Sequence, residues 1–154
     1  MSLGTILIII LILIAALVGM LVLSALDRRF GWSEIPAPVS LVGQVLAAIG
    51  LYITFLVVKE NSFSASTIRV FKNQKVISTG PYALVRHPMY TGTLLLALAS
   101  PVALGSWWGL LPVLLVIPVL VWRIFDEEKL LNAELPGYAD YASTVRYRLV
   151  PLAW

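Results

Sequence analysis

The sequence contains no cysteine and only one histidine, His87. Without thiols, the chain cannot form disulfides or cysteine-based metal sites, and one histidine does not make a metal-binding cluster. The zinc-protease pattern HExxH is absent, and so is the glycine-rich pattern GxGxxG of Rossmann-type nucleotide sites. We therefore predict no metal site, and a soluble Rossmann-type enzyme is disfavoured.

Charged residues are also scarce. They make up 12% of the 154 residues, whereas 60% are hydrophobic. Soluble domains are usually about 25% charged and about 45–50% apolar. The composition therefore predicts an integral membrane protein with a single domain over residues 1–154. The net charge is only +3, and the basic residues cluster beside apolar segments, so no nucleic-acid partner is expected.

Four apolar segments predict an all-α membrane protein. The first is an uncharged run of 24 residues, and about 20 are needed to cross the hydrocarbon core. The third and fourth are joined by a short uncharged turn and should form a C-terminal helical hairpin. Pro112 and Pro118 predict a bend in the fourth segment. The predicted transmembrane helices are 3–26, 38–58, 88–104 and 107–125.

Lysine and arginine are unevenly distributed among the polar segments. The first loop has two, the second has five, the hairpin turn has none and the C-terminal segment has four. Because an excess of positive charge stays on the cytoplasmic side, we expect both termini and the active site to face the cytosol. The segments 59–87 and 126–154 would then be cytosolic and would bind the cofactor.

Two further patterns bear on packing. Gly43, Ala47, Ala48 and Gly50 are small residues at helical spacing in the second segment, and they would let another helix approach closely. That helix could belong to the same chain or to a second copy, so both a monomer and a homodimer stay open. Short β-prone runs at 67–71 and 76–78 indicate a small ribbon or an interfacial strip.

The single histidine lies at the start of the third apolar segment. It stands between Arg86 and Pro88. A proline disfavours helix at the residue before it and is well suited to the first position of a helix. We therefore expect His87 to lie just outside a helix that begins at Pro88, at a membrane edge.

The hairpin should bring this edge close to a second group of polar residues. Two segments of similar length return the chain to its starting depth, so His87 and Tyr90 should lie near Arg123, Glu127 and Glu128. Charged groups at a membrane edge are expensive unless they are paired or used. Such a group would suit a zwitterionic or cationic ligand with a ring. The alternative is that these residues only anchor helix ends and form an aromatic belt.

The combined pattern resembles a known family. It consists of Gly80-Pro-Tyr-Ala-Leu-Val-Arg-His-Pro-Met-Tyr-Thr-Gly92, Arg123 with Glu127-Glu128, Tyr138-x-x-Tyr141 and Arg148-Leu-Val-Pro151. It is similar to the integral-membrane methyltransferases that act on isoprenylcysteine carboxylates and on phospholipid amines. The likeness runs from about Asn61 to Trp154. It departs from the family's usual pattern at Glu134 to Tyr138, which leaves Arg146 and Arg148 as alternatives.

The resemblance implies S-adenosylmethionine as the methyl donor, bound in a polar cytosolic pocket. It implies a lipidic acceptor, and the sequence leaves open whether oxygen, nitrogen or sulfur is methylated and whether a base is needed. The implied catalytic residues are Arg123, Glu127 and Glu128. The implied cofactor-binding residues are Pro81, Tyr82, Arg86, His87, Pro88, Tyr90, Glu127, Glu128 and Arg148.

Two alternatives remain at this point. Membrane sterol reductases resemble the C-terminal region and use a reduced nicotinamide cofactor, although they are typically longer. A non-enzymatic helical membrane module, in which the polar residues are only anchors, would also have this composition.

Overall fold

The computed structural model of the protein describes residues 3–61 and 75–154. Every regular element in this part of the chain is helical, which confirms the predicted all-α class. The β-prone run at 67–71 lies outside the described residues, and residues 75–78 have no regular secondary structure. The helices are α1 (Leu3–Phe30), α2 (Ala37–Glu60), the 3-10 helix η1 (Gly80–Ala83), α3 (Pro88–Ala103), α4 (Leu110–Leu114), α5 (Val116–Glu134) and α6 (Tyr138–Thr144).

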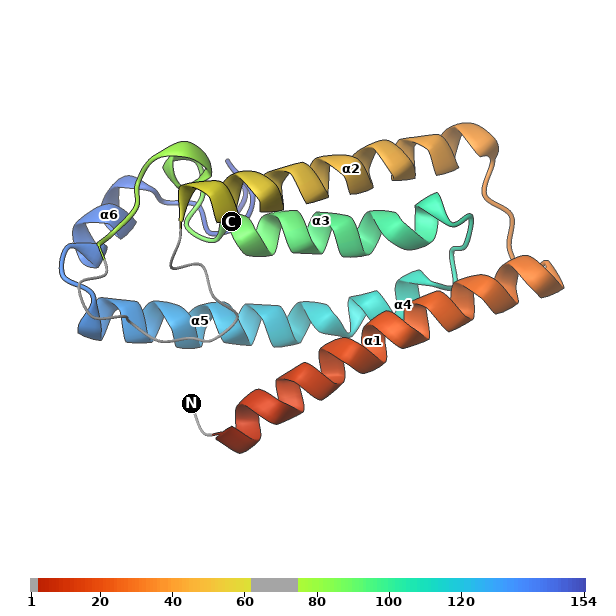
Figure 1. The fold of residues 1–154 in the computed structure, drawn as a ribbon, viewed down its shortest axis with the longest axis horizontal. Coiled ribbons are helices and arrows are strands. Elements are labelled where there is room, and N and C mark those ends of the chain that lie inside the picture. Colours follow the sequence, from red (N-terminus) through yellow and green to blue (C-terminus); the bar gives the residue numbers. More distant parts are fainter. Residues whose placement is uncertain (1–2, 62–74) are drawn as a thin grey trace.

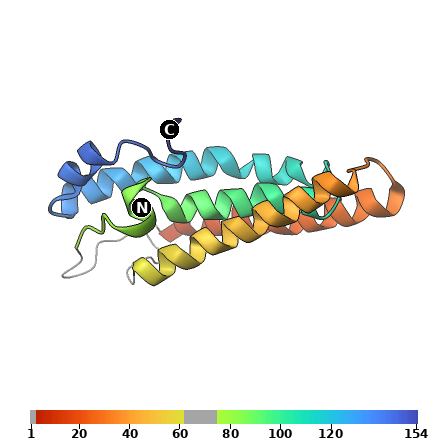
Figure 2. The same cartoon turned by 90° about the horizontal axis from the view of Figure 1, so that it is seen from above.

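The long helices run back and forth, so the bundle has two ends (Figure 1). One end, called here the far end, contains residues 27–36 and 104–109. The opposite end, called the site end, contains residues 60–61, 75–90 and 126–154. Figure 2 shows the same elongated bundle from above, with α6 and the C-terminus at the site end. Within the bundle, α2 packs along α3, and α1 packs against α4 and α5.

Among the described residues, two helices have the length and composition needed to cross a membrane. They are Leu7–Phe30, with a mean hydropathy of 3.2, and Ala37–Glu60, with a mean hydropathy of 2.3. Large apolar side chains on both are exposed, among them Leu11 and Phe55. This exposure is what a lipid-facing surface requires, because lipid tails are as apolar as these side chains.

The predicted hairpin is present, but its two arms differ from the predicted spans. Helix α3 is an apolar helix of 16 residues, about 24 Å long at 1.5 Å per residue and shorter than the hydrocarbon core of about 30 Å. The predicted last span is interrupted at one residue, Leu115, between α4 and α5, and the backbone of Leu115 keeps right-handed helical angles. Pro118 has no N–H to donate to the carbonyl of Leu114 four residues earlier, which explains why α4 stops there.

Close contact between α2 and α3 depends on glycine. A Cβ on Gly43 would lie 2.6 Å from the backbone nitrogen of Ala103, and one on Gly50 would lie 2.7 Å from that of Leu96. A Cβ on Gly92 would lie 2.9 Å from the carbonyl oxygen of Gly50. The small-residue face of α2 is therefore covered by α3 of the same chain, as expected for close helix packing.

The far end is joined by one buried carboxylate. Asp27 has 0% exposure and accepts hydrogen bonds from the backbone N–H and the hydroxyl of Ser33, at 2.7 and 2.6 Å. It also accepts one from the hydroxyl of Ser106. These contacts connect α1, the loop that follows it and the α3–α4 turn. Helix α1 continues past the predicted end at residue 26 and terminates at Gly31, whose φ of +65° suits a glycine after a helix.

Candidate functional site

The histidine segment is held in place by the C-terminal segment. Pro88 is the first residue of α3, and His87 precedes the helix with φ −123° and ψ 59°, as the sequence predicts. The backbone N–H of Arg86 donates to the carbonyl of Tyr147 at 2.8 Å, and that of His87 donates to the carbonyl of Arg148 at 2.9 Å. This backbone pairing places Arg148 beside the start of α3.

Glu128 on α5 lies at the centre of a buried ionic cluster. One carboxylate oxygen is 3.3 Å from His87 Nε2 and 3.3 Å from Arg86 Nε. The other oxygen is 3.0 Å from both Nε and Nη2 of Arg148. We call Arg86, His87, Glu128 and Arg148 the Glu128 cluster. Glu128 is only 7% exposed, and such a carboxylate needs positive partners to remain charged.

These partners set the protonation state of Glu128. Burial alone would raise the pKa of its carboxyl group. The contacts with His87, Arg148 and Arg86 outweigh burial, and they hold the pKa of Glu128 below its usual value. Glu128 is therefore ionised at neutral pH and is a weak proton acceptor.

A second group of polar side chains lies beside the first. The hydroxyl of Tyr90 donates to a Glu127 carboxylate oxygen at 2.7 Å and accepts from Arg123 Nε at 2.7 Å. We call Tyr90, Arg123 and Glu127 the Tyr90 cluster. The rings of His87 and Tyr90 are stacked, with their centroids 5.8 Å apart. The two clusters therefore form one continuous polar site.

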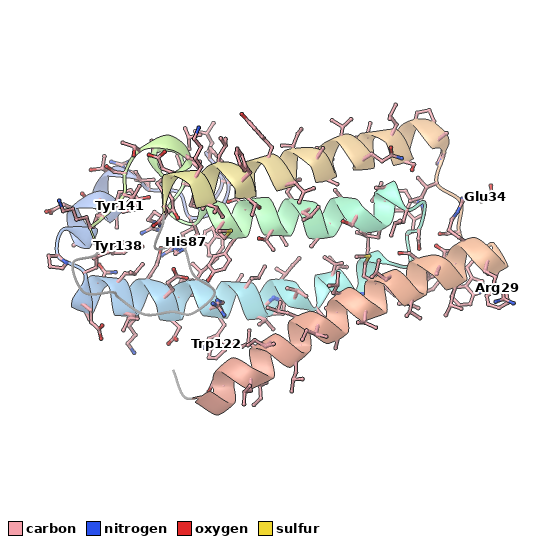
Figure 3. The ribbon with its side chains drawn as sticks, in the orientation of Figure 1. Arg29, Glu34, His87, Trp122, Tyr138 and Tyr141 are labelled. Carbon is pink, nitrogen blue, oxygen red and sulfur yellow. The ribbon has the colours of Figure 1, made fainter. Side chains whose placement is uncertain are left out.

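Helical spacing explains why α5 supplies three of these residues. Arg123 and Glu127 are four residues apart, which places them on one face of the helix, and Glu128 follows. The helix extends to Glu134, well beyond the apolar segment that ends at residue 125. The predicted meeting of His87 and Tyr90 with Arg123, Glu127 and Glu128 is confirmed, and Figure 3 shows His87 pointing from the start of α3 towards α5.

A buried aromatic group adjoins the ionic site. Leu135, Tyr138, Tyr141 and Val145 form a compact apolar cluster against which Tyr82 packs. The Tyr82 hydroxyl accepts a hydrogen bond from Asn61 Nδ2 at 2.9 Å. The Tyr141 hydroxyl donates to the carbonyl of Tyr82 at 2.8 Å. This packing fixes η1 against α6 and thereby positions the segment that leads to His87.

Not every residue implied by the resemblance reaches the ionic site. Pro81 lies in η1 and shapes the turn, since its carbonyl accepts from the N–H groups of Leu84 and Val85. Arg148 contacts Glu128, whereas the Arg146 side chain is exposed and only its carbonyl, 3.4 Å from Arg86 Nη2, takes part. The geometry thus selects Arg148 from the two alternatives.

The sequence analysis missed residues that contact the site. The guanidinium of Arg148 lies over the rings of Phe125 and Trp154, at 5.1 and 5.5 Å from their centroids. Tyr138 is also missed as a site residue. These contacts depend on how the C-terminal segment folds back, and no spacing in the sequence encodes that path. The Tyr138-x-x-Tyr141 pattern was the one feature of the sequence that pointed to Tyr138.

Comparison with known proteins supplies a family. The model of the phospholipid methyltransferase family matches residues 39–135, more than half of the chain. This range contains most of α2 and all of α3, α4 and α5, including His87, Glu127 and Glu128. A comparison with curated proteins found no match. With two apolar helices long enough to cross a membrane and a polar site at one end of the bundle, the chain belongs to the phospholipid methyltransferase family and is a membrane methyltransferase.

Proposed function

We propose that the protein transfers a methyl group from S-adenosylmethionine to a lipidic acceptor at the site end of the bundle. The observation that carries this proposal is the contact between the Glu128 cluster and the Tyr90 cluster. It gathers two carboxylates, three guanidinium groups and an imidazole in one largely buried place. A site with both charge signs beside apolar helices suits a zwitterionic donor and a lipidic acceptor.

The residues fit the proposed donor. S-adenosylmethionine, when bound, supplies a methyl group attached to a positively charged sulfur. Carboxylates and aromatic faces stabilise such a cation, and guanidinium groups bind the carboxylate of its amino-acid group. Glu127, Tyr90 and Arg86 provide these functions within one site, and the Tyr138 hydroxyl is a buried donor beside them without a partner among the described residues.

The two carboxylates would then have different tasks. Glu128 contacts two guanidinium groups and one imidazole, and so fixes the position of Arg86, His87 and Arg148. Glu127 contacts the Tyr90 hydroxyl, which Arg123 orients from the other side. If the acceptor is an amine, its nitrogen bonds to the methyl carbon as the carbon–sulfur bond breaks, and one N–H proton must leave. Glu128 is a poor base for that proton, because its partners lower its pKa. Glu127 is the other carboxylate of the site.

The acceptor class follows from the surroundings of the site. The exposed apolar surface of α1 and α2 would lie in the bilayer, so a lipid can reach the site without crossing water. The family description names phospholipids, which favours a phospholipid amine over an isoprenylcysteine-like carboxylate. The excess of lysine and arginine in segments 59–87 and 126–154 supports a cytosolic location of the site end.

The test uses the purified protein in lipid nanodiscs. Calorimetry should show binding of S-adenosylmethionine, and incubation with methyl-labelled donor and phosphatidylethanolamine should yield a labelled lipid. A prenylated cysteine carboxylate serves as the competing acceptor. Thermal stabilisation by a reduced nicotinamide cofactor, together with no binding of S-adenosylmethionine, would overturn the proposal.

A further inference from the structure

Two tyrosines on the same helix differ in one respect. Tyr138 and Tyr141 lie one turn apart on α6, and both are buried, with 3% and 8% exposure. The Tyr141 hydroxyl donates to the carbonyl of Tyr82. The Tyr138 hydroxyl has no hydrogen-bond partner within residues 3–61 and 75–154. Figure 3 shows both rings at the same end of the bundle as His87.

An unpartnered buried hydroxyl requires an explanation. Most buried polar atoms in native proteins are hydrogen-bonded, and burying one without a partner is destabilising. Tyr82, packed in the same group, has its hydroxyl bonded to Asn61. Tyr138 is therefore the exception among the three tyrosines. A ligand that accepts a hydrogen bond from its hydroxyl would remove the destabilisation that comes from burying this group without a partner.

The surroundings of Tyr138 define the ligand group that would suit it. Burial raises the pKa of Tyr138, so its hydroxyl stays protonated and acts as a donor. Tyr138 packs with Tyr141, and the Tyr141 hydroxyl lies 2.8 and 3.5 Å from the carbonyls of Tyr82 and Val85, so this part of α6 lies beside the segment that leads into Arg86. The Arg86 Nε atom is likewise buried without a hydrogen bond among the described residues, although it lies 3.3 Å from Glu128.

Both groups are donors, and one of them is positively charged. The matching ligand group is therefore an acceptor with negative charge, and a carboxylate is the form that binds guanidinium and hydroxyl groups together. Glu128 lies 3.3 Å from Arg86 Nε, but this contact does not have hydrogen-bond geometry, and no acceptor among the described residues bonds to the Tyr138 hydroxyl. The proposed donor carries such a carboxylate on its amino-acid group.

We propose that Tyr138, together with Arg86, binds the carboxylate of the methyl donor's amino-acid group. This inference rests on the proposed function, since it assigns one end of the proposed donor to named side chains. It predicts that the hydroxyl contributes to ligand binding and contributes nothing favourable to the folded protein without ligand. The Tyr141 hydroxyl should instead stabilise the folded protein without ligand and should not contact the ligand.

The experiment compares Tyr138→Phe with the matched variant Tyr141→Phe in the full-length protein. The two ligands are S-adenosylhomocysteine, which has the carboxylate, and its decarboxylated analogue, which keeps the amine. Calorimetry should show that Tyr138→Phe weakens binding of S-adenosylhomocysteine about tenfold or more, with unchanged affinity for the decarboxylated analogue. Tyr141→Phe should change the affinity for both ligands by a similar factor, because its hydroxyl is bonded to the carbonyl of Tyr82 and does not face the ligand's carboxylate.

Thermal unfolding without ligand provides the second readout. Tyr138→Phe should keep or raise the melting temperature, and Tyr141→Phe should lower it because its hydrogen bond to Tyr82 is lost. A lower melting temperature for Tyr138→Phe would mean that the hydroxyl is engaged within the protein, and it would overturn the inference. Equal loss of affinity for both ligands would overturn the assignment to the carboxylate.

The two proposals fail in different ways. If the wild type binds S-adenosylhomocysteine and Tyr138→Phe binds it equally well, the role of Tyr138 is wrong and the proposed function stands. If the wild type binds neither S-adenosylhomocysteine nor S-adenosylmethionine, the proposed function is wrong and the assignment of Tyr138 fails with it.

Discussion

Each end of the bundle buries a carboxylate, and the two carboxylates have different partners. Asp27 at the far end accepts hydrogen bonds from the uncharged groups of Ser33 and Ser106. Glu128 at the site end meets two guanidinium groups and an imidazole. The serine donors around Asp27 satisfy that carboxylate, so its role is to connect segments of the fold. The two arginines and the histidine around Glu128 form a charged site, and such a site can also bind a ligand.

The strongest test of this contrast is Glu128→Ala. The change leaves Arg86, His87 and Arg148 without their shared negative partner, and breaking a buried ionic contact in this way costs about 3–5 kcal/mol. We expect a large fall in the free energy of unfolding and loss of donor binding, measured by denaturation and calorimetry. Glu128→Gln is the control that keeps the side-chain volume. Donor affinity unaffected by Glu128→Ala would contradict the assignment of a charged ligand site.

Asp27→Ala should affect only the fold. It removes the acceptor for Ser33 and Ser106, and each buried donor left without a partner costs about 1–3 kcal/mol. Denaturation should show the loss of stability, while calorimetry at a temperature where the variant is folded should give unchanged affinity for S-adenosylmethionine. A fall in affinity comparable to that of Glu128→Ala would remove the distinction between the two ends.

Arg148→Lys sharpens the description of the site end. Lysine keeps the charge but cannot place two nitrogen atoms on Glu128, and it loses the flat contact with Phe125 and Trp154. We expect a loss of about 1 kcal/mol in the free energy of unfolding and weaker donor binding. Arg146→Lys is the matched control and should change neither quantity, because the Arg146 side chain is exposed.

The smallest expected effect is the dependence of stability on pH. The pKa of Glu128 is lower in the folded protein than its ordinary value of 4.5. Its ionic contacts therefore stabilise the fold fully above about pH 4.5, and this contribution is lost as the pH falls through the lowered pKa. The difference in stability between the wild type and Glu128→Gln should shrink as the pH falls below 4.5. A constant difference down to pH 3 would contradict the lowered pKa.

Much of the site end could be predicted from local rules. Pro88 fixes the start of α3 and keeps His87 out of the helix, and helical spacing places Arg123 and Glu127 on one face. The hairpin then brings the two groups together. These inferences need only backbone geometry and sequence distance, so they did not depend on knowing how the rest of the chain packs.

Other features depended on packing that no local pattern reveals. The last apolar segment is interrupted at Leu115. Helix α5 continues to Glu134, through polar residues that lie beyond the end of the hydrophobic pattern. The sequence could not decide between Arg146 and Arg148. That decision is made by the backbone hydrogen bonds of Arg86 and His87 to the C-terminal segment. The unpartnered hydroxyl of Tyr138 could be recognised only once all its neighbours were known.

The pairing of the Arg86 and His87 amides with the carbonyls of Tyr147 and Arg148 has a consequence for biosynthesis. A ribosome releases residues 86 and 87 long before residues 147 and 148. The helices can thus be made before the segment that holds Arg86 and His87 in place. The Glu128 cluster is complete only after translation has passed Arg148 and the C-terminal segment has folded back.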